Sequence, residues 1–307
     1  MAYREDYVDS LRKPTRRAFL QSVGVAASVV AATGTREAHA QGAAKQNLDS
    51  GGDTYATHAK GIRILAGQWR PHYPWEHIAW VSPKWPSQDY IWLDFPEAIF
   101  TNQGLLYLSH VNPPIPTVFH DLPKVPWREL PNGIAFDREL PNGVRFGGSV
   151  TTSGESTVDL EIHLKNGTSE DLTDITLQTC SFLRAIKEFS DYTRGNKFVH
   201  VPKSGWIPMT EALTIQQETE KYRVGWRTRG KSVADLPLVV TVSNEAERLF
   251  AMTWKEDTLS MISNPHHPCV HADPQFKDLE PGEESTIHGK LIFLEGKLED
   301  FDWEKYI

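Results

Sequence analysis

The sequence has little of what marks several large classes of protein. Its 307 residues include only two cysteines, so a scaffold held together by disulfide bonds is excluded. It contains no run of about 18 or more apolar residues, which excludes a multi-pass helical membrane protein. Basic residues are in the minority, with 32 Lys and Arg against 40 Asp and Glu, and this acidic balance argues against a nucleic-acid binder.

Several short patterns that support common chemistries are also missing. There is no P-loop, no dinucleotide fingerprint, no Gly-x-Ser-x-Gly elbow and no Cys-x-x-Cys pair. Apolar bulk, by contrast, is ample: 39% of the residues are hydrophobic, and the aromatic residues include ten Trp and thirteen Phe. The chain can therefore build a core, which excludes a disordered or coiled-coil protein.

The N-terminal 40 residues have the organisation of an export signal. Residues 15–20 (TRRAFL) resemble the twin-arginine signal of bacterial secretory proteins, and a mildly apolar stretch follows. Residues 38–40 (AHA) form a small-x-small cleavage site. An amphipathic N-terminal helix and an uncleaved membrane anchor are the alternatives. We expect cleavage after Ala40, export through the twin-arginine machinery to the periplasm or the exterior, and a mature form that does not span the membrane.

The composition after residue 40 changes twice. Residues 41–60 are small, polar and glycine-rich, which predicts a flexible linker. Twelve of the twenty prolines lie between residues 71 and 141, together with five tryptophans. Because proline blocks helix interiors, residues 61–140 should contain short strands and ordered loops pinned by aromatic side chains. We expect residues 61–307 to form a single domain, with regular antiparallel strands over residues 141–295.

The later part of the chain has the alternation of antiparallel strands. Between Thr157 and Lys165 every second residue is apolar, and an Asn-Gly-Thr sequence that favours a hairpin turn follows. A tandem repeat at 129–136 and 139–146 contains Pro-Asn-Gly turns, which indicates successive strands of a meander. Only 184–192 and 211–222 have helix signals, both weak. The sequence therefore predicts an all-β protein built as an antiparallel β-sandwich.

Two features resemble a known group of folds. The strand–Asn-Gly-Thr–strand unit at 157–182 and the Leu-x-Pro-Gly-Glu turn at 279–283 are similar to the galactose-mutarotase-like supersandwich of carbohydrate epimerases and polysaccharide lyases. The resemblance covers about residues 140–295. It implies a supersandwich-like fold, a carbohydrate ligand, and acid–base chemistry by a histidine and a carboxylate on the concave sheet.

The densest group of chemically active residues lies at 264–274. If this segment is extended, His267, Cys269, His271 and Asp273 share one face, because side chains of a strand alternate. Imidazole, thiolate and carboxylate groups at this spacing are candidate ligands for Zn or Cu. A rigid loop with a buried Cys269, or a loop that contacts substrate, would have the same sequence.

Two histidines are the candidates for proton transfer under the resemblance. His200 and His271 would act with a carboxylate such as Glu161, Glu188 or Asp273. The alternative for each is a histidine that only forms hydrogen bonds on a partly buried sheet.

Aromatic side chains are the candidates for substrate binding, because the apolar faces of sugar rings pack against aromatic planes. Asp89, Asp94, Glu97 and Arg128 are candidates for binding hydroxyl groups, although aromatic residues in proline-rich segments also form minor cores. The proposed substrate-binding residues are Trp75, Trp80, Trp85, Trp92, Arg128 and Trp206.

The two cysteines, Cys180 and Cys269, permit either a disulfide in an oxidising compartment or two buried thiols. A disulfide would be incompatible with Cys269 as a metal ligand. Three hypotheses therefore stand: a carbohydrate-modifying enzyme, a non-catalytic glycan- or partner-binding module, and a metalloprotein that uses residues 267–273.

Overall fold

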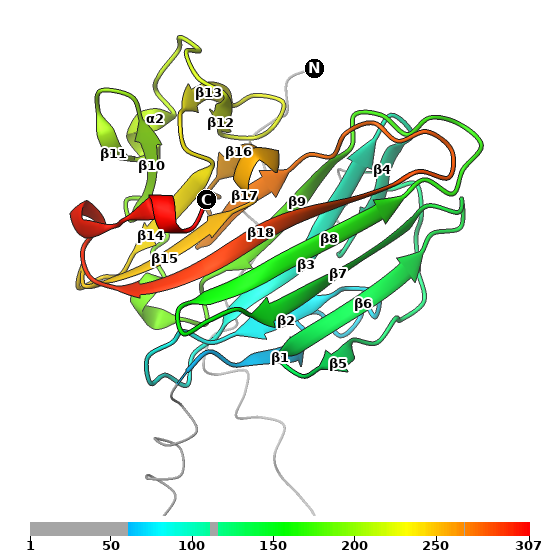
Figure 1. Cartoon of the computed structure of the whole chain (residues 1–307), viewed down its shortest axis with the longest axis horizontal. Helices are drawn as coiled ribbons and strands as arrows, with labels where there is room; N and C mark the ends of the chain where they lie inside the picture. Colours follow the sequence, from blue (N-terminus) through cyan, green and yellow to red (C-terminus); the bar gives the residue numbers. More distant parts are fainter. Residues whose placement is uncertain (1–60, 111–115, 267) are drawn as a thin grey trace, which may run out of the picture. The chain divides into compact units, whose positions relative to one another are not determined.

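The computed structural model describes residues 61–110, 116–266 and 268–307, and Figure 1 shows their arrangement. The predicted signal segment, the predicted linker and His267 lie outside these residues. Two nine-stranded sheets make up the fold, and Figure 1 shows one in front of the other. This architecture confirms the predicted all-β sandwich.

The first sheet has the strand order β1-β2-β3-β9-β17-β16-β12-β13, and β4 pairs with β3. Its strands are β1 (Ile64–Gly67), β2 (Ile78–Val81), β3 (Ile91–Thr101), β4 (Gly104–Leu108), β9 (Thr176–Phe182), β12 (Tyr222–Val224), β13 (Lys231–Ala234), β16 (Thr258–Ile262) and β17 (Cys269–Pro274). All of these pairs are antiparallel except β12 with β16. The proline- and tryptophan-rich half therefore contributes β1–β4 directly to this sheet.

The second sheet has the order β11-β10-β14-β15-β18-β8-β7-β6-β5. Its strands are β5 (Arg128–Leu130), β6 (Gly133–Glu139), β7 (Arg145–Thr152), β8 (Thr157–Lys165), β10 (Lys197–Val201), β11 (Gly205–Pro208), β14 (Leu238–Val242), β15 (Arg248–Thr253) and β18 (Glu284–Glu295). The tandem repeat forms part of the meander β5–β6–β7, as predicted.

The apolar alternation of β8 places its hydrophobic side chains in the core. Val158, Leu160, Ile162 and Leu164 are buried, while the intervening residues are partly exposed. The core between the sheets also takes in Phe95, Trp254 and Phe293. Burial of these apolar faces is the main favourable contribution to folding.

The expected hairpin after β8 does not form. β8 pairs with β7 and β18, whereas β9, the next strand along the chain, pairs with β3 and β17 in the other sheet. The Asn-Gly-Thr segment therefore begins a crossing between the two sheets. The prediction was wrong because turn chemistry specifies a local reversal of the chain and not the partner of the next strand.

The helical segments are shorter than predicted. In place of 184–192 there is a single 3₁₀ turn, η2 (Lys187–Phe189), and in place of 211–222 one turn of α-helix, α2 (Met209–Ala212). Neither has a side-chain cap at its N-terminus, which fits their brevity. Three further 3₁₀ turns are η3 (Lys255–Asp257), η4 (Leu298–Asp300) and η5 (Trp303–Lys305). Within the described ranges no helix has the length and apolar character needed to cross a bilayer.

Candidate functional site on the outer face of the first sheet

The two faces of the first sheet differ in what they contact. Thr179 and Ser181 of β9 point toward the second sheet: the Thr179 hydroxyl accepts a 3.0 Å hydrogen bond from Nε1 of Trp254, and the Ser181 hydroxyl donates to Sδ of Met252 at 3.4 Å. Because side chains alternate along a strand, Cys180 lies between them on the opposite face. We call that opposite side the outer face.

Strand register brings residues from distant parts of the sequence into two rows on the outer face. Across β3, β9 and β17, one row contains Trp92, Phe182 and Cys269, and the next contains Asp94, Cys180 and His271. Asp273 follows two residues after His271 and therefore shares its face.

Two more side chains join from β3 and from the residues after β4. The register of β3 against β9 shifts between Asp94 and Ala98, and the carboxylate of Glu97 lies among the same groups. Glu97 Oε2 is 3.8 Å from His271 Nδ1, and Glu97 Oε1 is 4.0 Å from His110 Nε2. The set is named the outer cluster and consists of Asp94, Glu97, His110, Cys180, Cys269, His271 and Asp273.

Asp94 is held in place by neighbouring polar groups. The Ser109 hydroxyl donates a 2.8 Å hydrogen bond to Asp94 Oδ2, and an Arg70 guanidinium nitrogen lies 3.2 Å from the same oxygen. Arg70 also pairs with Glu76 at 2.9 Å. These contacts fix the orientation of a carboxylate that is only 1% exposed.

His271 has a different chemical group on each side of its ring. Its Nδ1 is 3.3 Å from Asp273 Oδ1, and its Nε2 is 3.4 Å from Cys269 Sγ. The backbone N–H of Thr179 donates to Asp273 Oδ1 at 3.1 Å, so Asp273 is itself fixed. Trp226, from the loop between β12 and β13, places its ring edge-on to His271 at 6.0 Å between centroids.

Burial and crowding change the acidity of these groups. Burial raises the pKa of Asp94 to about 7, with Arg70 opposing the rise and the Glu97 charge adding to it. Burial likewise raises the pKa of Glu97, against the opposing charge of His271. Burial raises the pKa of Asp273 as well, again opposed by His271. Burial thus favours the protonated form of each of these carboxyls, and carboxyls shifted in this way are common in acid–base sites.

Two triplets within the described residues have ligand atoms close enough to hold one metal ion. In each triplet the atoms lie within 4.8 Å of one another; one consists of Cys180, Cys269 and His271, and the other of Asp94, Glu97 and His110. The predicted metal set overlaps the first triplet in Cys269 and His271. Asp273 belongs to the predicted set but lies on the other side of the His271 ring. Cys180 is the third member of the triplet, close to the Cys269 thiol.

The two histidines predicted for proton transfer are in different sheets. His271 belongs to the outer cluster, whereas His200 is on β10 of the second sheet, where its Nδ1 is 2.7 Å from Asp235 Oδ1. Of the carboxylates suggested as partners, Asp273 lies 3.3 Å from His271. The other two have different contacts: Glu188 pairs with Arg248 at 2.9 Å, and Glu161 lies 3.9 Å from His288.

The residues predicted to bind substrate are also divided. Trp75 and Trp85 belong to the core, at 7% and 3% exposed, so they pack mainly against protein. Trp80 and Trp92 are partly exposed and face each other across β2 and β3, with ring centroids 6.3 Å apart. For these two rings, sugar binding stays a prediction.

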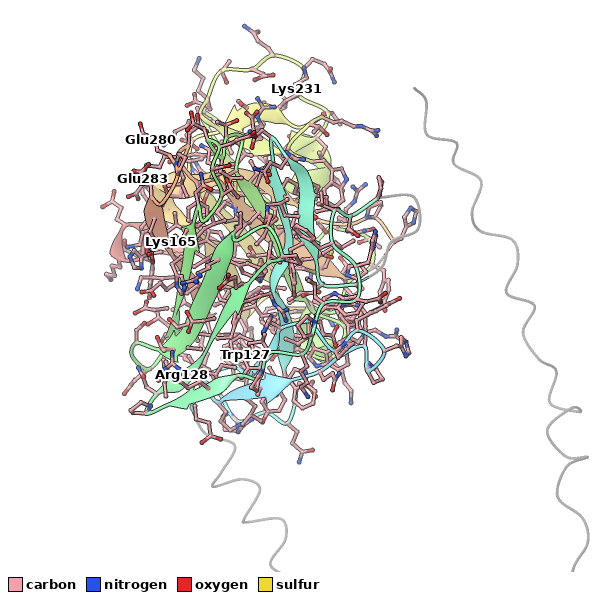
Figure 2. The ribbon with its side chains drawn as sticks, turned by 90° about the vertical axis from the view of Figure 1, so that its right-hand side faces the viewer. Trp127, Arg128, Lys165, Lys231, Glu280 and Glu283 are labelled. Atoms are coloured by element: carbon pink, nitrogen blue, oxygen red, sulfur yellow. The ribbon has the colours of Figure 1, made fainter. Side chains whose placement is uncertain are left out.

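The remaining two lie away from this aromatic pair. Trp206, on β11, contacts His200 edge-on at 5.4 Å. Arg128, on β5, is 3.7 Å from Asp137. Figure 2 shows Arg128 far from Lys231, the first residue of β13, which follows the loop that carries Trp226. A sugar-binding role for Trp206 or Arg128 would therefore belong to another part of the surface.

Sequence reasoning missed several members of the site. Alternation along β9 is enough to place Cys180 on a face, but the pairing of β9 with β17 has no local signal. His110 and Arg70 lie outside the strands, where the alternation of residues does not predict the direction of a side chain. The only available signal was residue type: histidine and arginine close to a strand that carries two carboxylates.

Comparison with known proteins gives structural likenesses only. No protein-family model and no curated protein matches the chain. A candidate aldose 1-epimerase from Escherichia coli K12 has a TM-score of 0.40 at 9% identity, over 76% of this chain and 100% of that one. A GalM/aldose epimerase homologue from C. elegans has a TM-score of 0.37 at 12% identity, over 78% and 100% of the two chains.

A third solved structure, the Slr1438 protein from Synechocystis sp. PCC 6803, has a TM-score of 0.39 at 10% identity, over 76% of this chain and 97% of that one. At such scores these likenesses assign neither a family nor an activity to the chain. The structure itself defines the class: a two-sheet β-sandwich with a buried cluster of acid, imidazole and thiol groups on the outer face of one sheet.

Proposed function

We propose that this protein modifies a carbohydrate by acid–base chemistry at a sugar ring, and that its active site is the part of the outer cluster formed by Asp94, Glu97, His110 and His271. The observation that carries the proposal is the grouping of Asp94, Glu97 and His110, whose ligand atoms lie within 4.8 Å of one another. Epimerisation, elimination and hydrolysis at a sugar all need a proton donor and a proton acceptor within reach of one ring.

Exposure indicates which groups a substrate would reach. The side chains of Glu97 and His110 are 16% and 24% exposed, whereas those of His271 and Asp273 are each 3% exposed. Glu97 lies between the imidazoles of His110 and His271, at 4.0 and 3.8 Å. We therefore assign proton transfer to Glu97 and His110, and orientation of the Glu97 carboxylate to His271.

Aromatic rings beside the cluster provide the binding surface in this proposal. Trp69 is stacked between Phe182, at 4.4 Å, and the guanidinium of Arg70, at 3.8 Å, so both of its faces are occupied. Trp92 contacts Trp69 through a ring edge at 5.7 Å and is partly exposed. Trp92 is accordingly the ring that we expect to pack against the sugar.

Site-directed variants test the assignment against a panel of free aldoses and uronate-containing oligosaccharides, with turnover followed by NMR. Glu97→Gln and His110→Ala should each lower turnover by about 10²–10⁴-fold while sugar binding is retained. Trp92→Ala should weaken binding by about tenfold. Glu161→Gln, which alters a carboxylate on the second sheet, is the matched control and should leave turnover unchanged.

These variants, together with His200→Ala, decide between the proposal and its alternatives. Loss of turnover in His200→Ala, with full activity in Glu97→Gln, would move the site to the pair formed by His200 and Asp235, at 2.7 Å. Binding that depends on Trp92, with no turnover of any sugar, would instead identify a non-catalytic glycan-binding module.

Export is the second part of the proposed function. We propose that the twin-arginine machinery exports the protein and that the mature chain begins at Gln41, in the periplasm or outside the cell. The support is the order of residues 15–20, the apolar stretch and residues 38–40 in the sequence.

A further inference from the structure

We propose that Cys180, Cys269 and His271 bind a thiophilic transition-metal ion, Zn²⁺ or Cu⁺. The site goes beyond the proposed sugar chemistry, because it uses the thiols of the outer cluster and not the exposed Glu97 and His110. It shares only His271 with that chemistry.

The first support is the geometry of the three side chains. Cys180 lies directly opposite His271 in the register of β9 with β17, and Cys269 precedes His271 by two residues on the same face. The Cys269 Sγ to His271 Nε2 distance is 3.4 Å. A tetrahedral zinc ion with ordinary Zn–S and Zn–N bonds separates these atoms by about 3.6 Å. Small side-chain adjustments would therefore admit the ion.

The second support is the group behind the imidazole ring. Asp273 Oδ1 is 3.3 Å from His271 Nδ1, on the side of the ring away from Cys269. Nδ1 forms no hydrogen bond within the described residues, and a small rotation of either side chain would let it donate to this carboxylate and leave the Nε2 lone pair directed at the thiols. Histidines that ligate metals commonly donate the second ring nitrogen to a carboxylate in this way.

The third support is the enclosure of the ligands. Cys180, Cys269 and His271 are 3%, 0% and 2% exposed, and Phe182, Trp69 and Trp92 pack against the thiols. Two sulfurs and one imidazole nitrogen select Zn²⁺ or Cu⁺ over the oxygen-seeking Mg²⁺ and Ca²⁺. Binding of Zn²⁺ displaces the two thiol protons to solvent, so the two thiolates balance the charge of the ion.

The test uses the mature protein, purified without oxygen and without a metal-affinity tag. Plasma mass spectrometry should find about one Zn or Cu per chain. After the metal is removed, Co²⁺ should restore one equivalent with sulfur-to-cobalt charge-transfer absorption. Cys180→Ser and Cys269→Ser should each abolish that absorption. His110→Ala, which alters the same face outside the thiol set, should bind Co²⁺ like the wild type.

Asp273→Asn tests the positioning role, and it should weaken Co²⁺ binding by about 10–100-fold without removing the sulfur absorption. If circular dichroism shows that a serine variant is unfolded, the wild-type protein provides the test. In the wild type, Zn²⁺ or Cu⁺ should protect both thiols from alkylation. The proposal would be overturned by metal binding that survives the double serine variant, by thiols that no metal protects, or by a Cys180–Cys269 disulfide in the anaerobic preparation. Loss of metal binding with sugar turnover intact, or the reverse, separates the two proposals.

Discussion

Three histidines of this chain have three different surroundings, and each surrounding gives the ring a different property. His271 lies among thiols and carboxylates, and His200 is paired with one aspartate near the protein surface. His77 is fully buried, stacked on Phe136 at 3.7 Å and edge-on to Trp127 at 5.5 Å. Burial, together with the charge of Arg138, lowers the pKa of His77 to about 3.

His77 should make the protein sensitive to mild acid. The unfolded chain protonates this residue near its ordinary pKa of 6.5, whereas the folded chain does so only near 3. The contribution of His77 to the free energy of unfolding therefore has its full value above pH 6.5. As the pH falls from 6.5 toward 3, the free energy of unfolding should decrease by about 1.4 kcal/mol per pH unit.

Urea unfolding between pH 4 and pH 7 measures this contribution when wild type is compared with His77→Phe. The difference between the two curves should change by about 1.4 kcal/mol per unit below pH 6.5. His288→Gln removes an exposed histidine from β18, and in this variant the free energy of unfolding should depend on pH as it does in the wild type. Parallel curves for wild type and His77→Phe would show that His77 is protonated in the folded protein.

At the scale of elements, the two turns that resemble the supersandwich pattern are in contact with each other. Asn166 follows β8, and its side-chain Nδ2 donates to the carbonyls of Glu170 and Leu279 at 2.8 and 2.9 Å. Its backbone N–H donates to the Glu283 carbonyl at 2.9 Å, and its own carbonyl accepts from Gly282 at 2.7 Å. The buried Asn166 therefore ties the crossing between the sheets to the turn that leads into β18.

Replacement of Asn166 should loosen this junction. Asn166→Ala removes both Nδ2 hydrogen bonds and the two that Thr168 donates to Asn166 Oδ1, so we expect a loss of about 2–3 kcal/mol in the free energy of unfolding. Thermal or urea unfolding measures the loss. Asn132→Ala is the control: this residue is in an exposed turn between β5 and β6, and its replacement should cost about 0.5 kcal/mol or less. Equal losses of unfolding free energy in Asn166→Ala and Asn132→Ala would contradict the stabilising role of Asn166 at this junction.

The sequence predicted where strands lie along the chain better than it predicted which strands pair with each other. Alternation from Val158 to Leu164 predicted β8 and its buried face, and Pro-Asn-Gly predicted the meander of β5–β7. The hairpin after Lys165 was wrong because the next strand joins the other sheet. Pairing between strands distant in sequence is decided by packing of whole faces, which no local pattern reports.

The candidate site follows the same rule. Cys269, His271 and Asp273 were placed on one face because alternation alone decides that arrangement. The register of β9 with β17 brings Cys180 to the cluster, and the register shift in β3 brings Glu97. His110 lies just after the end of β4. None of these features has a local signal in the sequence. The tryptophans were recognised as a group, but the sequence could not separate Trp75 and Trp85, which are buried, from Trp92, which is partly exposed.

At the scale of the whole molecule, the proposed export route makes a prediction about location. Replacing Arg16 and Arg17 together by lysine keeps the charge but removes the guanidinium pair that defines the signal. We expect the double variant to remain inside the cell at its precursor length, whereas wild type should be recovered outside the inner membrane with Gln41 as its first residue.

Cell fractionation with N-terminal sequencing measures this in a bacterium that has a working twin-arginine pathway. Arg12→Lys alters a basic residue upstream of the pair and should be exported normally. Export of the double lysine variant at the wild-type rate would refute the twin-arginine route.

The position of β18 has a consequence for biosynthesis. This strand, the last along the chain, lies in the middle of the second sheet between β8 and β15. Until the ribosome has made residues up to 295, β8 and β15 present open edges, and such edges invite aggregation. Folding must therefore follow synthesis of nearly the whole described chain, and a nascent chain halted before β18 becomes a client for chaperones.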